Sequence, residues 1–138
     1  VLDWEGGQSV EWVNEFVNIV HDQTGIWPWI YANPWRFNQG GVEQNCMRWI
    51  ASYPDVLRPG LDYDPGEPPE TDGLVGCWQY ASDGQVPGYA GNLDVNRFFG
   101  SVGAWMAYAG VPSTGAPSEP IGQSVLENDR FRVTIEEK

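Results

Sequence analysis

The hydrophobic positions at the start of the chain change period, from alternation in residues 1–5 to helical spacing in residues 9–25. The first segment, VLDWE, carries strand-forming residues and is followed by two glycines, which favour a sharp change of direction. The second segment begins at Ser9, which favours an N-cap, and ends at Gly25, which favours a C-cap. The apolar residues near helical spacing are Trp12, Phe16, Ile19 and Val20. The pattern predicts a strand followed by an amphipathic helix.

Four further segments predict strands. WPWIYAN (27–33) is closed by an Asn-Pro pair, and CMRWIASY (46–53) follows a polar, glycine-rich stretch. LVGCWQYAS (74–82) is almost continuously apolar in its first half, which predicts burial on both faces, as in a parallel sheet. LDVNRFF (93–99) predicts a short fifth strand after the turn SDGQVPGYAGN (82–92). The alternation of strands and helix indicates an α/β fold.

The other segments are interpreted from their glycine and proline content. Residues 62–73, DYDPGEPPETDG, predict an exposed loop without regular structure, and residues 100–110 predict a closing helix that their glycines weaken. Residues 111–120 have the composition of a linker. Residues 121–138 are compatible with one strand, two strands or a tail. A length of 138 residues allows one domain with an appended tail.

Charge and composition restrict the partners. A formal net charge of -12 and a pI near 4.1 argue against binding to nucleic acid or to an anionic membrane surface. No apolar run approaches the ~20 residues that span a bilayer, so membrane insertion is not expected, and no signal-peptide pattern is visible. The 8 Trp exceed what packing alone usually requires. Tryptophan, tyrosine and acidic residues together are typical of a carbohydrate-binding cleft.

The first strand places two carboxylates on one side. Side chains alternate in an extended segment, so Asp3 and Glu5 share one face and Trp4 takes the other. Two acids ~6.6–7 Å apart along a strand repel each other, which raises the proton affinity of at least one of them. This arrangement suits general acid catalysis. The alternative is a solvated strand end with two surface acids.

The remaining reactive residues give weaker signals. His21, the single histidine, lies on the predicted helix surface, which argues against a catalytic triad or a histidine metal site. Cys46 and Cys77 lie beside neighbouring predicted strands, where either a disulfide or two reduced thiols is possible. The acids of the 62–73 loop do not match an EF-hand, which favours a solvated loop over a calcium site. They are Asp62, Asp64, Glu67, Glu70 and Asp72. No metal or cofactor is expected.

Five motifs occur in an order that resembles the glycoside hydrolase family 25 muramidases, the lysozymes that cut N-acetylmuramic acid–N-acetylglucosamine linkages in peptidoglycan. They are LDWE, WIYANPW, RWIASY, GCWQYAS and VPGYAGNLDVNRF, and together they cover roughly residues 1–108. Each motif is common by itself, whereas the ordered set is specific. The resemblance implies a fold, the second half of a modified TIM-like (β/α)5(β)3 barrel, and a peptidoglycan substrate.

The resemblance also implies roles for individual residues. The D-x-E pair of the family falls on Asp3 and Glu5, at the carboxyl end of a barrel strand. Glu5 is then the general acid, and Asp3 stabilises or orients the developing positive centre, through the 2-acetamido group of the substrate. Asp94 matches another acid of the cleft, although an Asp that caps the following turn is an equal alternative. The positions that match sugar-facing residues are Tyr31, Tyr53, Trp78 and Gln79, whereas Trp49 and Trp105 are assigned to packing.

One segment of the family is not found in this sequence. Members begin with a G-x-D-x-S strand that carries a further acid, and about half of the expected barrel precedes the D-x-E strand. We therefore expect residues 1–110 to form the C-terminal part of the catalytic barrel, followed by the 111–120 linker and a tail or wall-attachment segment over 121–138. The missing strands are expected from a longer chain, a second chain or a second copy, and the isolated chain is not expected to be an active monomer. The expected place of action is the bacterial wall, reached by secretion or by phage release.

Two alternative functions compete with the muramidase. The first is a chitinase of glycoside hydrolase family 18, whose signature also ends in D-W-E; the W-Q-Y-A-S and L-D-V-N-R-F segments favour the muramidase instead. The second is a non-catalytic remnant that binds wall glycan or docks into a phage structure through the same aromatic cleft.

Overall fold

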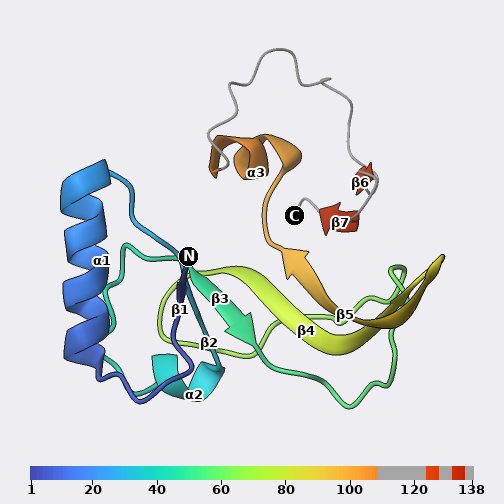
Figure 1. Ribbon diagram of the computed structural model, residues 1–138, viewed down its shortest axis with the longest axis horizontal. Helices are drawn as coiled ribbons and strands as arrows, with labels where there is room; N and C mark the ends of the chain where they lie inside the picture. The colour runs from blue at the N-terminus through green and yellow to red at the C-terminus, as the bar shows by residue number, and fades with distance from the viewer. Residues whose placement is uncertain (109–123, 128–131, 136–138) are drawn as a thin grey trace.

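The chain folds into a curled, mixed sheet flanked by helices, an α/β arrangement that forms a half-barrel (Figure 1). The computed structural model describes residues 1–108, 124–127 and 132–135. Its strands are β1 (Leu2–Asp3), β2 (Ile30–Ala32), β3 (Arg48–Ala51), β4 (Val75–Val86), β5 (Tyr89–Phe98), β6 (Ser124–Glu127) and β7 (Arg132–Ile135). Its helices are α1 (Val10–Thr24), α2 (Pro34–Phe37) and α3 (Val102–Tyr108).

The strand order is β1-β2-β3-β4-β5-β7-β6 in the described residues. Strands β1 to β4 are parallel, which the apolar first half of β4 predicted, and β5 runs antiparallel to β4. Strand β7 is parallel to β5 and antiparallel to β6, so two strands form within residues 121–138. The predicted linker at 111–120 lies outside the described residues.

Helix α1 has the predicted ends but buries different side chains. The Ser9 hydroxyl accepts a hydrogen bond from the Trp12 backbone N–H at 3.3 Å, and Gly25 adopts a left-handed conformation at φ 71°. The buried residues are Val13 and Val17. Trp12, Phe16 and Ile19, three of the predicted apolar positions, are 44%, 37% and 48% exposed. The helix carries two adjacent apolar stripes, and periodicity alone does not show which of them faces the sheet.

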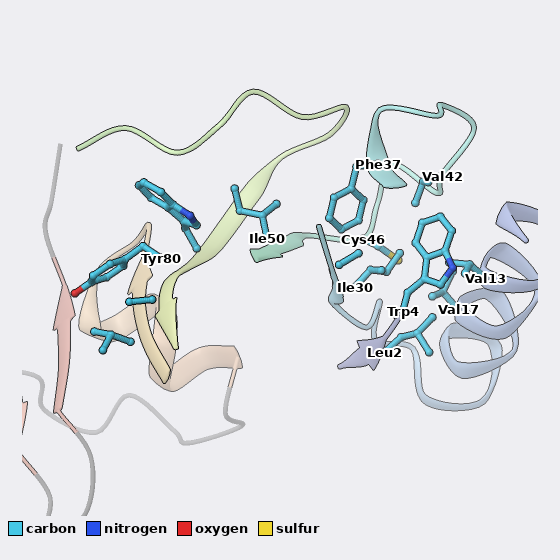
Figure 2. Packing of buried hydrophobic residues seen from close by; sticks show 14 residues of the cluster. Leu2, Trp4, Val13, Val17, Ile30, Phe37, Val42, Cys46, Ile50 and Tyr80 are labelled. Carbon is cyan, nitrogen blue, oxygen red and sulfur yellow. The ribbon is translucent and has the colours of Figure 1, made fainter. Parts of the chain in front are cut away.

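One face of the sheet, which we call the packed face, forms the hydrophobic core against α1 and α2. Its strand residues include Leu2, Trp4, Ile30, Ile50 and Trp78, all less than 9% exposed. Figure 2 shows Val13 and Val17 of α1 gathered beside Leu2 and Trp4, with Phe37 and Val42 close by. Burial of these apolar surfaces is the main source of stability in such a layer.

The predicted turn at residues 82–92 is wrong, because a β-hairpin occupies this segment. Strand β4 continues to Val86, and β5 begins at Tyr89 after a two-residue connection in which Gly88 has φ 85°. A Cβ atom at Gly84 would overlap the Val95 side chain, so glycine permits the strands to approach. The glycine residues that predicted a turn therefore belong to two closely paired strands, β4 and β5. In Figure 1 this hairpin extends away from α1.

The other predicted segments form as expected or settle an open choice. Residues 62–73 contain no helix or strand, and α3 forms within residues 100–110. Cys46 and Cys77 are buried free thiols, which settles the choice against a disulfide. Among the described residues, no group of three acidic, histidine or cysteine side chains is placed to hold a metal ion. The same residues include no helix with the length and apolarity needed to cross a bilayer.

Candidate active site

The second face of the sheet, which we call the acidic face, carries the predicted catalytic residues. Along β1 and its continuation, Leu2 and Trp4 are buried whereas Asp3 and Glu5 are exposed, as the alternation of a strand predicts. Backbone hydrogen bonds hold this segment in register, with the Trp4 N–H donating to the Tyr31 carbonyl at 2.8 Å. The two acids therefore project from the carboxyl end of a parallel strand.

Tyr31 is the centre of this face. It is the β2 partner of Asp3, so the two side chains leave the sheet on the same side. Burial first, and then the negative charges of Tyr53, Glu5, Asp94 and Asp3, raise the pKa of Tyr31 to about 12. The structure thus brings all three predicted catalytic acids into electrostatic reach of one phenol, although they come from two distant segments of the chain.

Gln79 connects two of the predicted sugar-binding tyrosines. Its Oε1 accepts a hydrogen bond from the Tyr31 hydroxyl at 2.6 Å and another from the Tyr53 hydroxyl at 2.9 Å. Gln79 is 5% exposed, whereas Tyr53 is 53% exposed. The buried amide is thus held between two phenols, with both lone pairs of its oxygen occupied.

Trp78 is the predicted site residue that the structure does not bring to this group. It is 3% exposed, lies in register with Ile50, and its indole N–H donates to the Ser52 carbonyl at 2.7 Å on the packed face. Neighbouring residues of a strand point to opposite faces, so Trp78 and Gln79 cannot both face a sugar. The same alternation was visible in the sequence WQY.

Two residues of the acidic face were not among the predicted site residues. Trp49, assigned to packing, is the β3 partner of Tyr31 and contacts its ring edge-on at a centroid distance of 5.9 Å. The Trp49 indole N–H donates to Asn96 Oδ1 at 2.8 Å. Asn96 lies two residues after Asp94, and that spacing within a strand was the signal that places it on the same side.

Arg36 holds the backbone of the segment that carries Glu5. Its Nη2 donates to the Glu5 carbonyl at 2.9 Å and to the Gly6 carbonyl at 2.6 Å, and its guanidinium lies 5.2 Å from the Trp4 ring centroid. Helix α2, which supplies Arg36, starts where β2 ends, and Asn33 caps it by accepting from the Arg36 N–H at 3.1 Å. Arg36, which follows β2, thus holds the backbone that follows the neighbouring strand β1.

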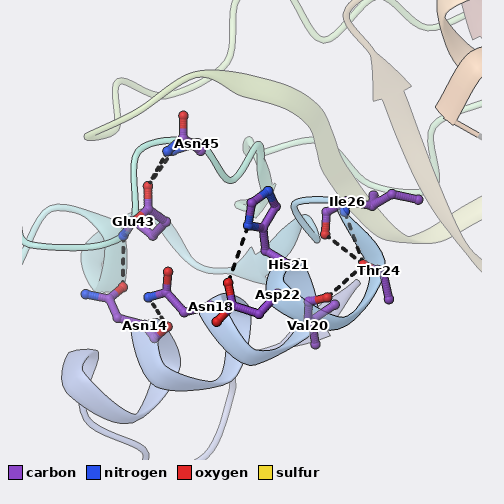
Figure 3. A network of polar contacts seen from close by, with 9 residues as sticks. All are labelled: Asn14, Asn18, Val20, His21, Asp22, Thr24, Ile26, Glu43 and Asn45. Carbon is purple, nitrogen blue, oxygen red and sulfur yellow. Dashed lines mark hydrogen bonds and ion pairs between the residues drawn. The ribbon is translucent and has the colours of Figure 1, made fainter.

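His21 lies in a separate polar region on α1, drawn in Figure 3 with Asp22 and the Asn14–Glu43 contact. Its ring stacks on Trp27 at a centroid distance of 3.9 Å, and its Nδ1 lies 4.0 Å from Asp22 Oδ1. The prediction that His21 belongs to the helix rather than to a catalytic group agrees with this position. The acidic face, by contrast, carries carboxylates, phenols, amides and the Trp49 indole.

The fold is similar to that of a solved muramidase. The structure of muramidase from Acremonium alcalophilum matches with a TM-score of 0.52 and 27% sequence identity, over 78% of this chain and 54% of that chain. The chain thus spans about half the length of the muramidase that it matches. No protein-family model matches the sequence, and no curated protein matches it. The chain has a muramidase-like fold.

Proposed function

We propose that this chain carries the catalytic residues of a peptidoglycan hydrolase, an N-acetylmuramidase of the glycoside hydrolase family 25 type. The observation that carries the proposal is the convergence of Asp3, Glu5 and Asp94 on Tyr31, on the open face of a muramidase-like sheet. The half-barrel then corresponds to the second half of a modified TIM-like (β/α)5(β)3 barrel. Carboxylates at the carboxyl ends of parallel strands occupy the position where such barrels place catalysis.

The proposed mechanism divides the work between the acids. Glu5 donates a proton to the glycosidic oxygen, so that the leaving sugar departs as a neutral alcohol. Asp3 orients the 2-acetamido group of the substrate, which stabilises the positive charge that develops at the anomeric carbon. Asp94 adds a second negative charge beside that centre. Tyr31, Tyr53 and Gln79 line the sugar site, and no metal or cofactor takes part.

The complete enzyme, as we propose it, needs further strands. Within the described residues β1 pairs only with β2, so its other edge has no strand partner, and Asp3 and Glu5 are exposed. A closed barrel leaves no such edge. We propose that the closing strands come from a longer chain, a second chain or a second copy. The enzyme acts on the bacterial wall, after secretion or phage release.

The test is Glu5→Gln in the complete enzyme, which is this chain together with its closing strands. Removal of a general acid lowers the rate of wall lysis by about 10²- to 10⁴-fold, while glycan binding persists. Glu15→Gln is the matched control, because it makes the same change on the exposed surface of α1.

Lysis at the wild-type rate by Glu5→Gln would overturn the assignment of the acid. Release of reducing ends is measured on peptidoglycan and on chitin, since cleavage of chitin alone would favour a family 18 activity. Glycan binding with no lysis by the wild-type enzyme would favour a non-catalytic binding protein.

A further inference from the structure

The amide of Gln79 has its acceptor side occupied and its donor side free. Both hydroxyls donate to Oε1, from Tyr31 at 2.6 Å and from Tyr53 at 2.9 Å, which uses the two lone pairs of that oxygen. With Oε1 turned towards the two tyrosines, Nε2 lies on the side of the amide that faces away from them.

Nε2 has no hydrogen-bond partner among the described residues, and Gln79 is 5% exposed. Among all the described residues, Thr71 Oγ1 is the one buried side-chain polar atom that has no hydrogen-bond partner. Nε2 therefore keeps contact with solvent. A side chain that is nine-tenths buried, with two free N–H donors at its open end, is arranged to receive an acceptor from outside the protein.

The groups around Gln79 select the chemistry of that acceptor. The acidic face offers carboxylate oxygens, which accept hydrogen bonds, whereas Gln79 Nε2 only donates. A 2-acetamido group offers an N–H to a carboxylate and a carbonyl oxygen to Nε2, so it satisfies both. A protonated amine at the same sugar position satisfies the carboxylates but leaves Nε2 without a partner.

We infer that Gln79 is a specificity-determining residue, whose Nε2 binds the carbonyl oxygen of a 2-acetamido group and selects N-acetylated over de-N-acetylated glycan. The inference rests on the proposed function and adds to it the protein atom that recognises the acetyl group. The carboxylates alone attract a glycan amine by charge. Gln79 is therefore the group that opposes binding of the de-N-acetylated sugar.

The experiment measures the ratio of two dissociation constants on the 138-residue chain, in a Glu5→Gln background that blocks turnover. The ligands are a soluble oligosaccharide of alternating N-acetylglucosamine and N-acetylmuramic acid, and the same oligosaccharide after de-N-acetylation. Gln79→Glu keeps an oxygen acceptor for both tyrosines and removes the donor, while Gln79→Met removes the donor without adding charge. We expect each variant to lower the preference for the acetylated ligand by about tenfold, the size of one hydrogen bond.

Gln23→Glu, an exposed change on α1, is the control and keeps the wild-type preference. Nitrogen-15 NMR adds a direct readout: the Gln79 side-chain amide signal shifts with the acetylated ligand and stays in place with the de-N-acetylated one. An unchanged preference in both Gln79 variants, or equal shifts with both ligands, would overturn this inference and leave the proposed hydrolase intact. Failure of both oligosaccharides to bind would overturn the inference. Failure of the proposed function is judged separately, by the lysis assay of the complete enzyme.

Discussion

The two faces of the sheet use the same strands for opposite purposes. On the packed face, Leu2 and Trp4 are 8% and 1% exposed and contact α1 and α2. On the acidic face, Asp3 and Glu5 alternate with them and remain exposed beside Tyr31. One residue of displacement along β1 therefore separates a core position from a candidate catalytic position.

This difference teaches that stability and chemistry are separable in this chain. On the packed face, buried apolar side chains stabilise the fold, so the space available in the core limits which side chains it accepts. The acidic face carries charged and hydrogen-bonding groups, and what matters there is the direction in which each polar group points. Arg36 connects the two, because its guanidinium lies over Trp4 of the packed face while its donors hold the backbone of Glu5. Substitutions on the packed face, on the acidic face and at Arg36 are therefore expected to change stability and activity to different extents.

The largest effect is expected on the packed face. Trp4→Ala removes a buried indole that contacts the Phe37 ring at a centroid distance of 6.4 Å and whose N–H donates to the Gln8 carbonyl at 2.9 Å. We expect the free energy of unfolding to fall by about 3–5 kcal/mol, because truncation leaves a cavity. Urea denaturation measures the loss. Trp12→Ala, which truncates a 44% exposed tryptophan, is the control and should cost much less. Equal losses would show that the packed face is not the core.

An intermediate effect is expected at the residue that connects the faces. Arg36→Met keeps the length of the side chain over Trp4 but removes both hydrogen bonds to the carbonyls of Glu5 and Gly6. Because both hydrogen bonds are exposed, we expect only about 1 kcal/mol of lost stability. If Glu5 is the general acid, as proposed, its displacement impairs the chemical step, and in the complete enzyme we expect about a tenfold fall in the kcat of wall lysis with little change in KM.

Arg58→Met, on the 54–60 segment, serves as the control for loss of an exposed arginine and should leave kcat unchanged. If Arg36→Met lowers stability but leaves kcat at the wild-type value, the contact is purely structural and Glu5 does not depend on it.

The last effect appears only at alkaline pH, where groups on both faces lower the stability of the fold. Burial raises the pKa of Tyr31 on the acidic face and of Tyr80 in the core to about 12, from an ordinary value of 10.0. In the folded state these phenols keep protons that the unfolded chain releases, so their contribution is complete below pH 10 and is lost as the pH rises towards 12. Buried Cys77, whose pKa is also about 12, begins this loss near pH 9.

The measurement is the free energy of unfolding in urea at a series of pH values from 8 to 12. Tyr31→Phe removes one of the titrating groups and should flatten the decline between pH 10 and 12. A decline that is equally steep in Tyr31→Phe would mean that the packed face alone carries the pH dependence.

The sequence by itself determined the features that depend only on residues close together along the chain. Ser9 and Gly25 fix the ends of α1 because a cap depends only on nearby backbone groups. The alternation Leu2, Asp3, Trp4 follows from the two-residue period of a strand. The same rule places Trp78 on the packed face, because its neighbour Gln79 contacts Tyr31 on the acidic face.

Only the tertiary structure decided which surfaces meet. The apolar stripe of α1 that is buried, Val13 and Val17, depends on how the helix docks onto the sheet, and helical period alone leaves two candidates. The hairpin of β4 and β5 depends on pairing between strands, which overrides turn-forming composition. Arg36 and Glu5 are 31 positions apart, and their contact arises because parallel strands bring their carboxyl ends to one edge. The sequence by itself determined the periods, the caps and the acids; sheet register, a long-range property, determined that those acids surround Tyr31.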